Sequence, residues 1–84
     1  MSDDLIIIDD DLLFRDRLTR SMEKKGFNVE AYGDFISSMK RISEKNFDYA
    51  IVDMRLEDGS GLEIIKKIKD TSPETRSLLL AGYG

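Results

Sequence analysis

The sequence contains no cysteine and no histidine among its 84 residues. The absence of cysteine excludes both a disulfide framework and a thiolate metal site. The absence of histidine removes imidazole general bases, and it removes the usual ligand of most zinc and other transition-metal sites. Chemistry in this chain therefore has to be sought among its carboxylates.

Long apolar runs and concentrated positive charge are also missing. The longest wholly apolar run has four residues, whereas a membrane-spanning helix needs about 20. The net charge is −4 and no basic stripe stands out, which argues against nucleic-acid binding by this segment. Residues 1–4 carry no basic region typical of a secretory signal. We therefore expect one soluble, cytoplasmic domain over 1–84, with no membrane partner.

Apolar periodicity predicts strands and helices in alternation. Gly26 is placed for a left-handed helix cap, Asp34 for the N-cap of the second helix and Pro73 for a turn. Either Ser60 or Asp58 can cap the third helix. The predicted strands cover 5–9, 28–32, 47–53 and 77–80, the predicted helices cover 12–25, 35–45 and 61–71, and 54–59 is predicted to be a loop. This order predicts an α/β fold with a parallel sheet and right-handed crossovers.

Each predicted helix carries one apolar stripe that is expected to face the core. The basic residues of the first helix, Arg15 among them, are expected to form a solvated surface. Glu30 is expected to be exposed, and Asp58 is expected to be a solvated loop charge. Gly59 and Gly61 are expected to permit a tight turn into the third helix. The three stripes are Phe14, Leu18 and Met22, then Phe35, Met39 and Ile42, then Leu62, Ile65 and Ile68.

Two acidic segments each follow an apolar run. The run 5–8 precedes the aspartate triplet 9–11, and the run 49–52 precedes Asp53. In open α/β sheets the ligand crevice lies beyond the carboxyl ends of the strands, so the two segments meet there if both strands belong to one sheet. Such a cluster is unfavourable unless a cation neutralises it or one carboxyl stays protonated. A divalent metal ion is the simplest answer.

Each acidic segment taken alone has an ordinary structural interpretation. The triplet 9–11 can be a polar strand end followed by a helix N-cap, and Asp53 can be a turn-forming residue. The two together, at the ends of two strands, favour a shared site. A calcium-binding loop beginning at Asp53 is excluded, because Arg55 and a misplaced glycine break its pattern.

The chain resembles the receiver domain of two-component response regulators through two motifs. The first is Ile-Ile-Ile-Asp-Asp-Asp at 6–11, and the second is Asp-Met-Arg-Leu-Glu-Asp-Gly-Ser-Gly-Leu at 53–62. The second motif and the terminal Gly-Tyr-Gly at 82–84 are similar to the redox- and photosynthesis-type subgroup of these regulators. The resemblance implies a flavodoxin-like, doubly wound parallel sheet with strand order 2-1-3-4.

The resemblance also implies a role for each acidic residue. Asp53 would be the nucleophile that accepts a phosphoryl group from a sensor histidine kinase. Asp10 would bind Mg²⁺ directly and Asp9 mostly through water, with Asp53 and the backbone carbonyl of Arg55 as further ligands. Asp11 would face solvent and begin the first helix. Such a module catalyses its own phosphorylation and hydrolysis but is not a free-standing enzyme.

Two departures from the family pattern stand out. Receivers usually carry Ser or Thr at the tip of the fourth strand, where this chain has Ala81, which cannot donate a hydrogen bond. The family also continues with a fourth helix, a fifth strand ending in a phosphate-binding lysine and a fifth helix, so 1–84 is expected to be the N-terminal part of a receiver domain. The strand 77–80 would then be an uncovered edge that invites a homodimer or an element-exchanged dimer. DNA binding would belong to a further C-terminal domain.

Two alternatives stay open. Phosphatases of the haloacid-dehalogenase type also carry Asp-x-Asp after a first strand, and Asp9 would then be the nucleophile and Asp11 the acid/base. Such sites favour Thr or Val two residues after the second aspartate, where this chain has Leu13, and Asp53 would have no role. The other alternative is a signalling-dead interaction fragment that keeps the fold.

Overall fold

The computed structural model describes residues 3–81. Its strands and helices alternate in the predicted order, with one addition between β3 and α3. The elements are β1 (Asp4–Ile8), α1 (Leu12–Lys24), β2 (Asn28–Tyr32), α2 (Phe35–Glu44), β3 (Tyr49–Asp53), β4 (Arg55–Leu56), β5 (Gly59–Ser60), α3 (Gly61–Thr71) and β6 (Arg76–Leu80).

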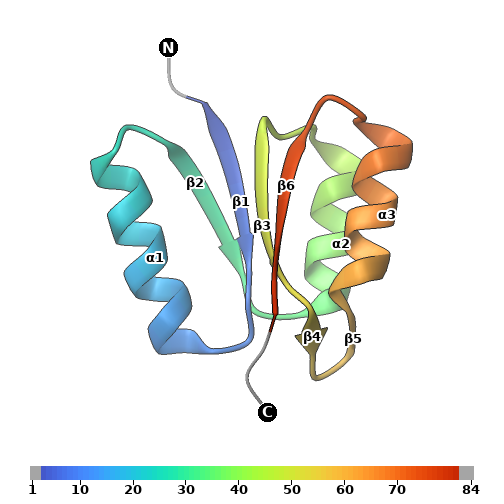
Figure 1. The fold of residues 1–84 in the computed structure, drawn as a ribbon, viewed down its shortest axis with the longest axis horizontal. Helices are drawn as coiled ribbons and strands as arrows, with labels where there is room; N and C mark the ends of the chain where they lie inside the picture. Colours follow the sequence, from blue (N-terminus) through green and yellow to red (C-terminus); the bar gives the residue numbers. More distant parts are fainter. Residues whose placement is uncertain (1–2, 82–84) are drawn as a thin grey trace.

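The main sheet is parallel and has four strands in the order β2-β1-β3-β6. This order confirms the predicted 2-1-3-4 arrangement, since β6 is the fourth strand of the main sheet. Helix α1 lies on one face of the sheet, and α2 and α3 lie on the other (Figure 1). With helices on both faces, β1 is buried along most of its length, which explains its uninterrupted apolar run.

The larger part of the core lies between the sheet and the pair α2 and α3. Ile6, Ile8 and Val52 reach it from the sheet, and Ile64 and Ile68 from α3. The predicted inner face of α3 is therefore only partly right, because Leu62 is 56% exposed while Ile64 is fully buried. The phase of the helix is set by its buried first residue, Gly61, which places positions 64 and 68 toward the sheet.

The helix ends follow the predicted capping residues. The carboxylate of Asp11 accepts a hydrogen bond from the Phe14 N–H at 3.1 Å, and that of Asp34 accepts from the Ser37 N–H at 2.8 Å. The Ser60 hydroxyl accepts from the N–H of Leu62 at 3.2 Å, so Ser60 and not Asp58 caps α3. Gly26 has a φ of 101° after the end of α1, which confirms the predicted left-handed position.

The segment 54–59 is not the plain loop that was predicted. Within it and just after it, β4 pairs antiparallel with β5, with Leu56 opposite Gly59. The side chain of Leu56 is 7% exposed and belongs to the core. Burial of this side chain draws the segment against the domain, which a prediction from local turn signals does not capture.

Glu30 is half-buried and ion-paired, so the prediction of an exposed side chain is wrong. The guanidinium of Arg41 in α2 donates to both of its carboxylate oxygens, at 2.7 and 3.0 Å. The ammonium of Lys45 lies 3.3 Å from the same carboxylate, and the Tyr32 hydroxyl donates to it at 2.8 Å. These contacts hold the pKa of Glu30 at about 2, below its ordinary value of 4.5, with the Arg41 hydrogen bonds as the main cause.

The α1 face of the sheet is less covered. Leu78 of β6 is 56% exposed, and α1 contains no buried residue. Among residues 3–81, no helix is long and apolar enough to cross a lipid bilayer. The exposure of Leu78 agrees with the predicted uncovered edge strand, and the dimer expected from it stays a prediction.

Candidate functional site

The acidic segments meet at one edge of the sheet. Asp9 and Asp10 directly follow β1, and Asp53 is the last residue of β3. β1 and β3 are adjacent and parallel, so their carboxyl ends lie side by side at the lower edge of the domain in Figure 1. The predicted convergence of these residues is therefore present in the structure.

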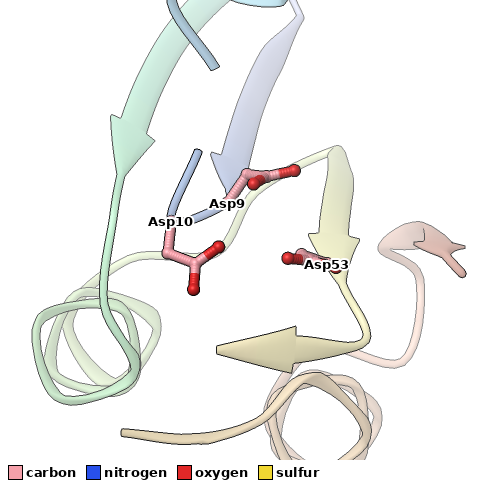
Figure 2. A group of neighbouring side chains, drawn as sticks. All are labelled: Asp9, Asp10 and Asp53. Atoms are coloured by element: carbon pink, nitrogen blue, oxygen red, sulfur yellow. The ribbon is translucent and has the colours of Figure 1, made fainter. Parts of the chain in front are cut away.

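The three carboxylates approach one another closely. One oxygen from each of Asp9, Asp10 and Asp53 lies within 4.8 Å of the other two. Figure 2 shows the side chains of Asp10 and Asp53 pointing toward each other from the two strand ends. Three hard oxygen donors at this spacing can share one small divalent cation.

Asp9 is the most buried member of the group, at 6% exposure. Burial raises its pKa, and the negative charges of Asp53, Asp10 and Asp11 raise it further. A hydrogen bond from the Asp11 N–H, at 2.9 Å, opposes this shift by stabilising the charged form. The net upward shift of this pKa means that burial and the neighbouring charges together disfavour the charged form of Asp9.

Hydrogen bonds to backbone groups fix the two strand ends. The Asp9 N–H donates to the Tyr32 carbonyl at 3.1 Å, and the Arg15 guanidinium donates to the Asp9 carbonyl at 2.8 Å. Arg15 is therefore not simply a solvated surface residue as predicted. On the other strand, the Met54 N–H donates to the Leu80 carbonyl at 2.9 Å.

The carboxylates line an open groove of about 560 Å³. Ala81 lies on its wall, at the position where the resemblance places a hydroxyl side chain. The rest of the lining is Asp9, Asp10, Asp11, Phe14, Asp53 and Leu80. The carboxylate of Asp11 caps α1, which agrees with its predicted role in beginning that helix.

Two further predictions concern Arg55 and the end of the chain. Arg55 lies in β4 with an exposed side chain, and its backbone carbonyl as a metal ligand stays a prediction. The terminal Gly82-Tyr83-Gly84 lies outside the described residues. Asp58 is exposed, as predicted, and its carboxylate also accepts a hydrogen bond from the start of α2. Asp58 and its partner Phe35 are 23 residues apart in sequence, so no local pattern indicates this contact.

The strand order, the helices on both faces and the carboxylates at adjacent strand ends define an α/β domain of the receiver class. Residues 5–84 match the family described as response regulator receiver domain, and the chain belongs to this family. None of the comparisons supports the haloacid-dehalogenase alternative.

The similar curated proteins are longer regulators. Over 81 residues the chain is 43% identical to the photosynthetic apparatus regulatory protein RegA of Rhodobacter capsulatus, covering 95% of this chain and 44% of that protein. The chain thus spans less than half the length of this relative. The match agrees with the predicted similarity to the redox- and photosynthesis-type subgroup.

Solved structures show the same fold. A response regulator from Burkholderia pseudomallei with a phosphorylated aspartic acid, calcium ion and citrate has a TM-score of 0.90 at 30% identity, covering 99% of this chain and 49% of that one. A CheY-like receiver domain protein from Methanospirillum hungatei JF-1 has a TM-score of 0.93 at 25% identity, covering 100% of this chain and 67% of that one.

Proposed function

We propose that this chain is a phosphoacceptor module in which Asp53 receives a phosphoryl group from the phosphohistidine of a sensor kinase. The observation that carries the proposal is the meeting of carboxylate oxygens from Asp9, Asp10 and Asp53 at the carboxyl edge of the sheet. The module acts on itself and is not a free-standing enzyme.

Mg²⁺ is the cofactor that fits this donor set. It prefers hard oxygen ligands and usually takes one or two carboxylates together with water and phosphate oxygens. Asp10 and Asp53 would bind it directly, Asp9 mostly through water, and the Arg55 carbonyl would complete the protein's share. When bound, Mg²⁺ would offset negative charge on the transferring phosphoryl oxygens. The similar Burkholderia pseudomallei regulator, with its phosphorylated aspartic acid and calcium ion, supports the pairing of a phosphoacceptor aspartate with a divalent cation.

In this reaction the main contribution of the chain is to position the Asp53 carboxylate. A carboxylate oxygen of Asp53 attacks the phosphorus atom, an O–P bond forms, and the P–N bond to the kinase histidine breaks with its electron pair left on nitrogen. Asp53 is the last residue of β3. The next residue, Met54, donates its N–H to the Leu80 carbonyl and accepts a hydrogen bond from the Gly61 N–H at its own carbonyl. A fixed backbone keeps the nucleophile in place for in-line attack.

Ala81 weakens one part of the site. It lines the groove but carries no hydroxyl, so one hydrogen bond to the phosphoryl group would be absent. A hydrogen bond to a charged acceptor contributes about 1.5–3 kcal/mol. The aspartyl phosphate of this chain would therefore be less stable than one formed with Ser or Thr at this position.

The biological setting is proposed on the same basis. Residues 1–84 would be the N-terminal part of a receiver domain in a cytoplasmic transcription regulator, with a sensor histidine kinase as partner. Similarity to the regulator RegA supports this setting. DNA binding would belong to another domain, and this segment would form homodimers through the edge that exposes Leu78.

A small phosphodonor tests the proposed function. The protein would be incubated with phosphoramidate with and without Mg²⁺, trapped by hydride reduction and digested for mass mapping. Magnesium-dependent label on Asp53, absent from Asp53→Asn, is expected. Label on Asp9 would support the phosphatase alternative. The absence of any label, together with no saturable response to Mg²⁺, would support the signalling-dead fragment.

A further inference from the structure

Asp58 joins the segment after β3 to the beginning of α2. Its carboxylate accepts a hydrogen bond from the Phe35 N–H at 2.8 Å and a longer one from the Ile36 N–H at 3.4 Å. The two partners are 23 and 22 residues away in sequence. The contact is therefore tertiary, although Asp58 itself is exposed.

The N-terminus of α2 suits this contact. The first N–H groups of a helix have no partner within the helix, and the helix dipole favours negative charge there. Asp34, the residue before the helix, satisfies only the Ser37 N–H with its side chain. Asp58 satisfies the two N–H groups that Asp34 leaves open in the first turn.

The residues on either side of Asp58 pack in the same place. A Cβ at Gly59 would overlap the side chain of Phe35, so β5 lies directly against the start of α2. Leu56 of β4 is buried in the core. The short hairpin of β4 and β5 is thus held by one buried side chain, one close glycine contact and one carboxylate.

This hairpin begins two residues after Asp53 and contains Arg55. We propose that Asp58 is a positioning residue for the phosphoacceptor site: by tying the hairpin to α2, it sets the backbone path at 54–55 and so the geometry available to Mg²⁺. This inference rests on the proposed function, because it assigns Asp58 a part in forming that same site. Asp58 itself touches neither the metal nor the phosphoryl group.

Three variants separate positioning from charge and from helix stability. Asp58→Ala removes the acceptor and the charge. Asp58→Asn removes the charge but keeps an oxygen that can accept from the Phe35 N–H. Asp34→Ala removes a carboxylate cap from the same helix end without touching the hairpin. Because Asp34→Ala also costs α2 a cap, the two alanine variants are expected to lower the thermal midpoint similarly.

Calorimetric titration with Mg²⁺ is the test. Residues that orient metal ligands typically change affinity by about 10–100-fold when removed. Asp58→Ala is expected to weaken binding about tenfold, whereas Asp58→Asn and Asp34→Ala are expected to stay within about twofold of the unmodified chain. Unchanged binding by Asp58→Ala would overturn the proposal. An equal loss of Mg²⁺ affinity in Asp58→Asn would show that the charge of Asp58 matters and not its hydrogen bonds. An equal loss in Asp34→Ala would show that helix stability matters. Either result would also overturn the proposal.

Amide hydrogen exchange tests the contact between Asp58 and α2 without depending on Mg²⁺ binding. If the unmodified chain bound no Mg²⁺, the proposed function would fail, but the positioning of the hairpin could still be measured. The Gly61 N–H donates to the Met54 carbonyl at 2.8 Å and reports the closing of the hairpin. Faster exchange of this amide in Asp58→Ala than in Asp34→Ala would support the role of Asp58 in holding the hairpin against α2. Equal exchange in both variants would contradict it.

Discussion

Gly61 lies directly against the backbone carbonyl of Asp53. A Cβ at position 61 would overlap that carbonyl oxygen, and the Gly61 N–H donates to the neighbouring Met54 carbonyl at 2.8 Å. Among residues 3–81 only Gly26 has a positive φ. Gly61 is therefore required for close approach of α3 to the end of β3, and not for the turn conformation predicted from the sequence.

Gly61→Ala should disturb both stability and the site. Forcing a methyl group into a filled space costs about 1–3 kcal/mol, and the shift would fall on the backbone of Asp53. Gly26→Ala is the matched control: it costs about 1–2 kcal/mol because of its left-handed φ, but a Cβ there meets nothing. Urea unfolding and Mg²⁺ titration together should show that only Gly61→Ala loses metal affinity. Equal affinity in the two variants would contradict the close contact.

The phase of α3 gives a second prediction. Ile64 is fully buried and Leu62 is 56% exposed. Ile64→Ala should lower the free energy of unfolding by about 2–5 kcal/mol, whereas Leu62→Ala should change it by no more than about 0.5 kcal/mol. Urea denaturation measures both. A larger loss of stability in Leu62→Ala than in Ile64→Ala would instead support the inner face of α3 predicted from the sequence.

Much of the fold and the core of the candidate site could be predicted from the sequence. The apolar run 5–8 indicates a buried parallel strand, and the acidic residues that follow two such runs had to meet once strand order was known. The caps Asp11, Asp34 and Ser60 lie within three residues of their partners. Patterns of short range or simple period predict such features well.

Other features depend on partners far away in sequence. Glu30 was predicted to be exposed from the alternation along its strand, yet Arg41, 11 residues further on, donates to its carboxylate. Asp58 reaches α2 over more than 20 residues. The exposed side of α3 was misassigned because Ile64, Ile65 and Leu62 permit more than one apolar stripe. Tertiary packing decides between such arrangements, and local propensity does not.

Acid should weaken the contact between β2 and α2. The pKa of Glu30 is lowered to about 2 in the folded state, so its stabilising effect is complete above about pH 4.5 and is lost as the pH falls through about 2. With partial exposure, Glu30→Gln should cost about 1 kcal/mol at pH 7, and this difference should shrink below pH 4. Urea unfolding of both proteins from pH 2 to 7 measures it. A constant difference would contradict the pairing.

Restoring a hydroxyl at position 81 should strengthen the phosphorylated state. Ala81→Thr adds a donor on the wall of the groove that holds Asp53. The gain should be about 1.5–3 kcal/mol, seen as tighter beryllofluoride binding and slower loss of phosphate. Ala81→Val, of similar shape without the donor, is the control. Equal gains in both variants would rule out the hydrogen bond.

Repulsion within the acidic group should be measurable without metal. Asp10→Asn removes one of the charges that raise the pKa of Asp9, so in chelator it should gain about 0.5–1 kcal/mol of stability. A saturating ligand at 100 times its Kd stabilises a protein by about 2.7 kcal/mol, and Asp10→Asn should gain less from Mg²⁺ than the unmodified chain. Thermal unfolding in Mg²⁺ and in chelator compares the two. Equal gains from Mg²⁺ would exclude Asp10 as a ligand.

The most direct test of the site is an NMR titration of the ¹⁵N-labelled chain with Mg²⁺. If carboxylates at the ends of β1 and β3 hold one ion, amide shifts will saturate with a single site and will concentrate at 9–11 and 53–55. Phosphoryl acceptance by Asp53 depends on that site. Shifts that do not saturate, or that spread evenly over the acidic surface, would contradict a shared metal centre.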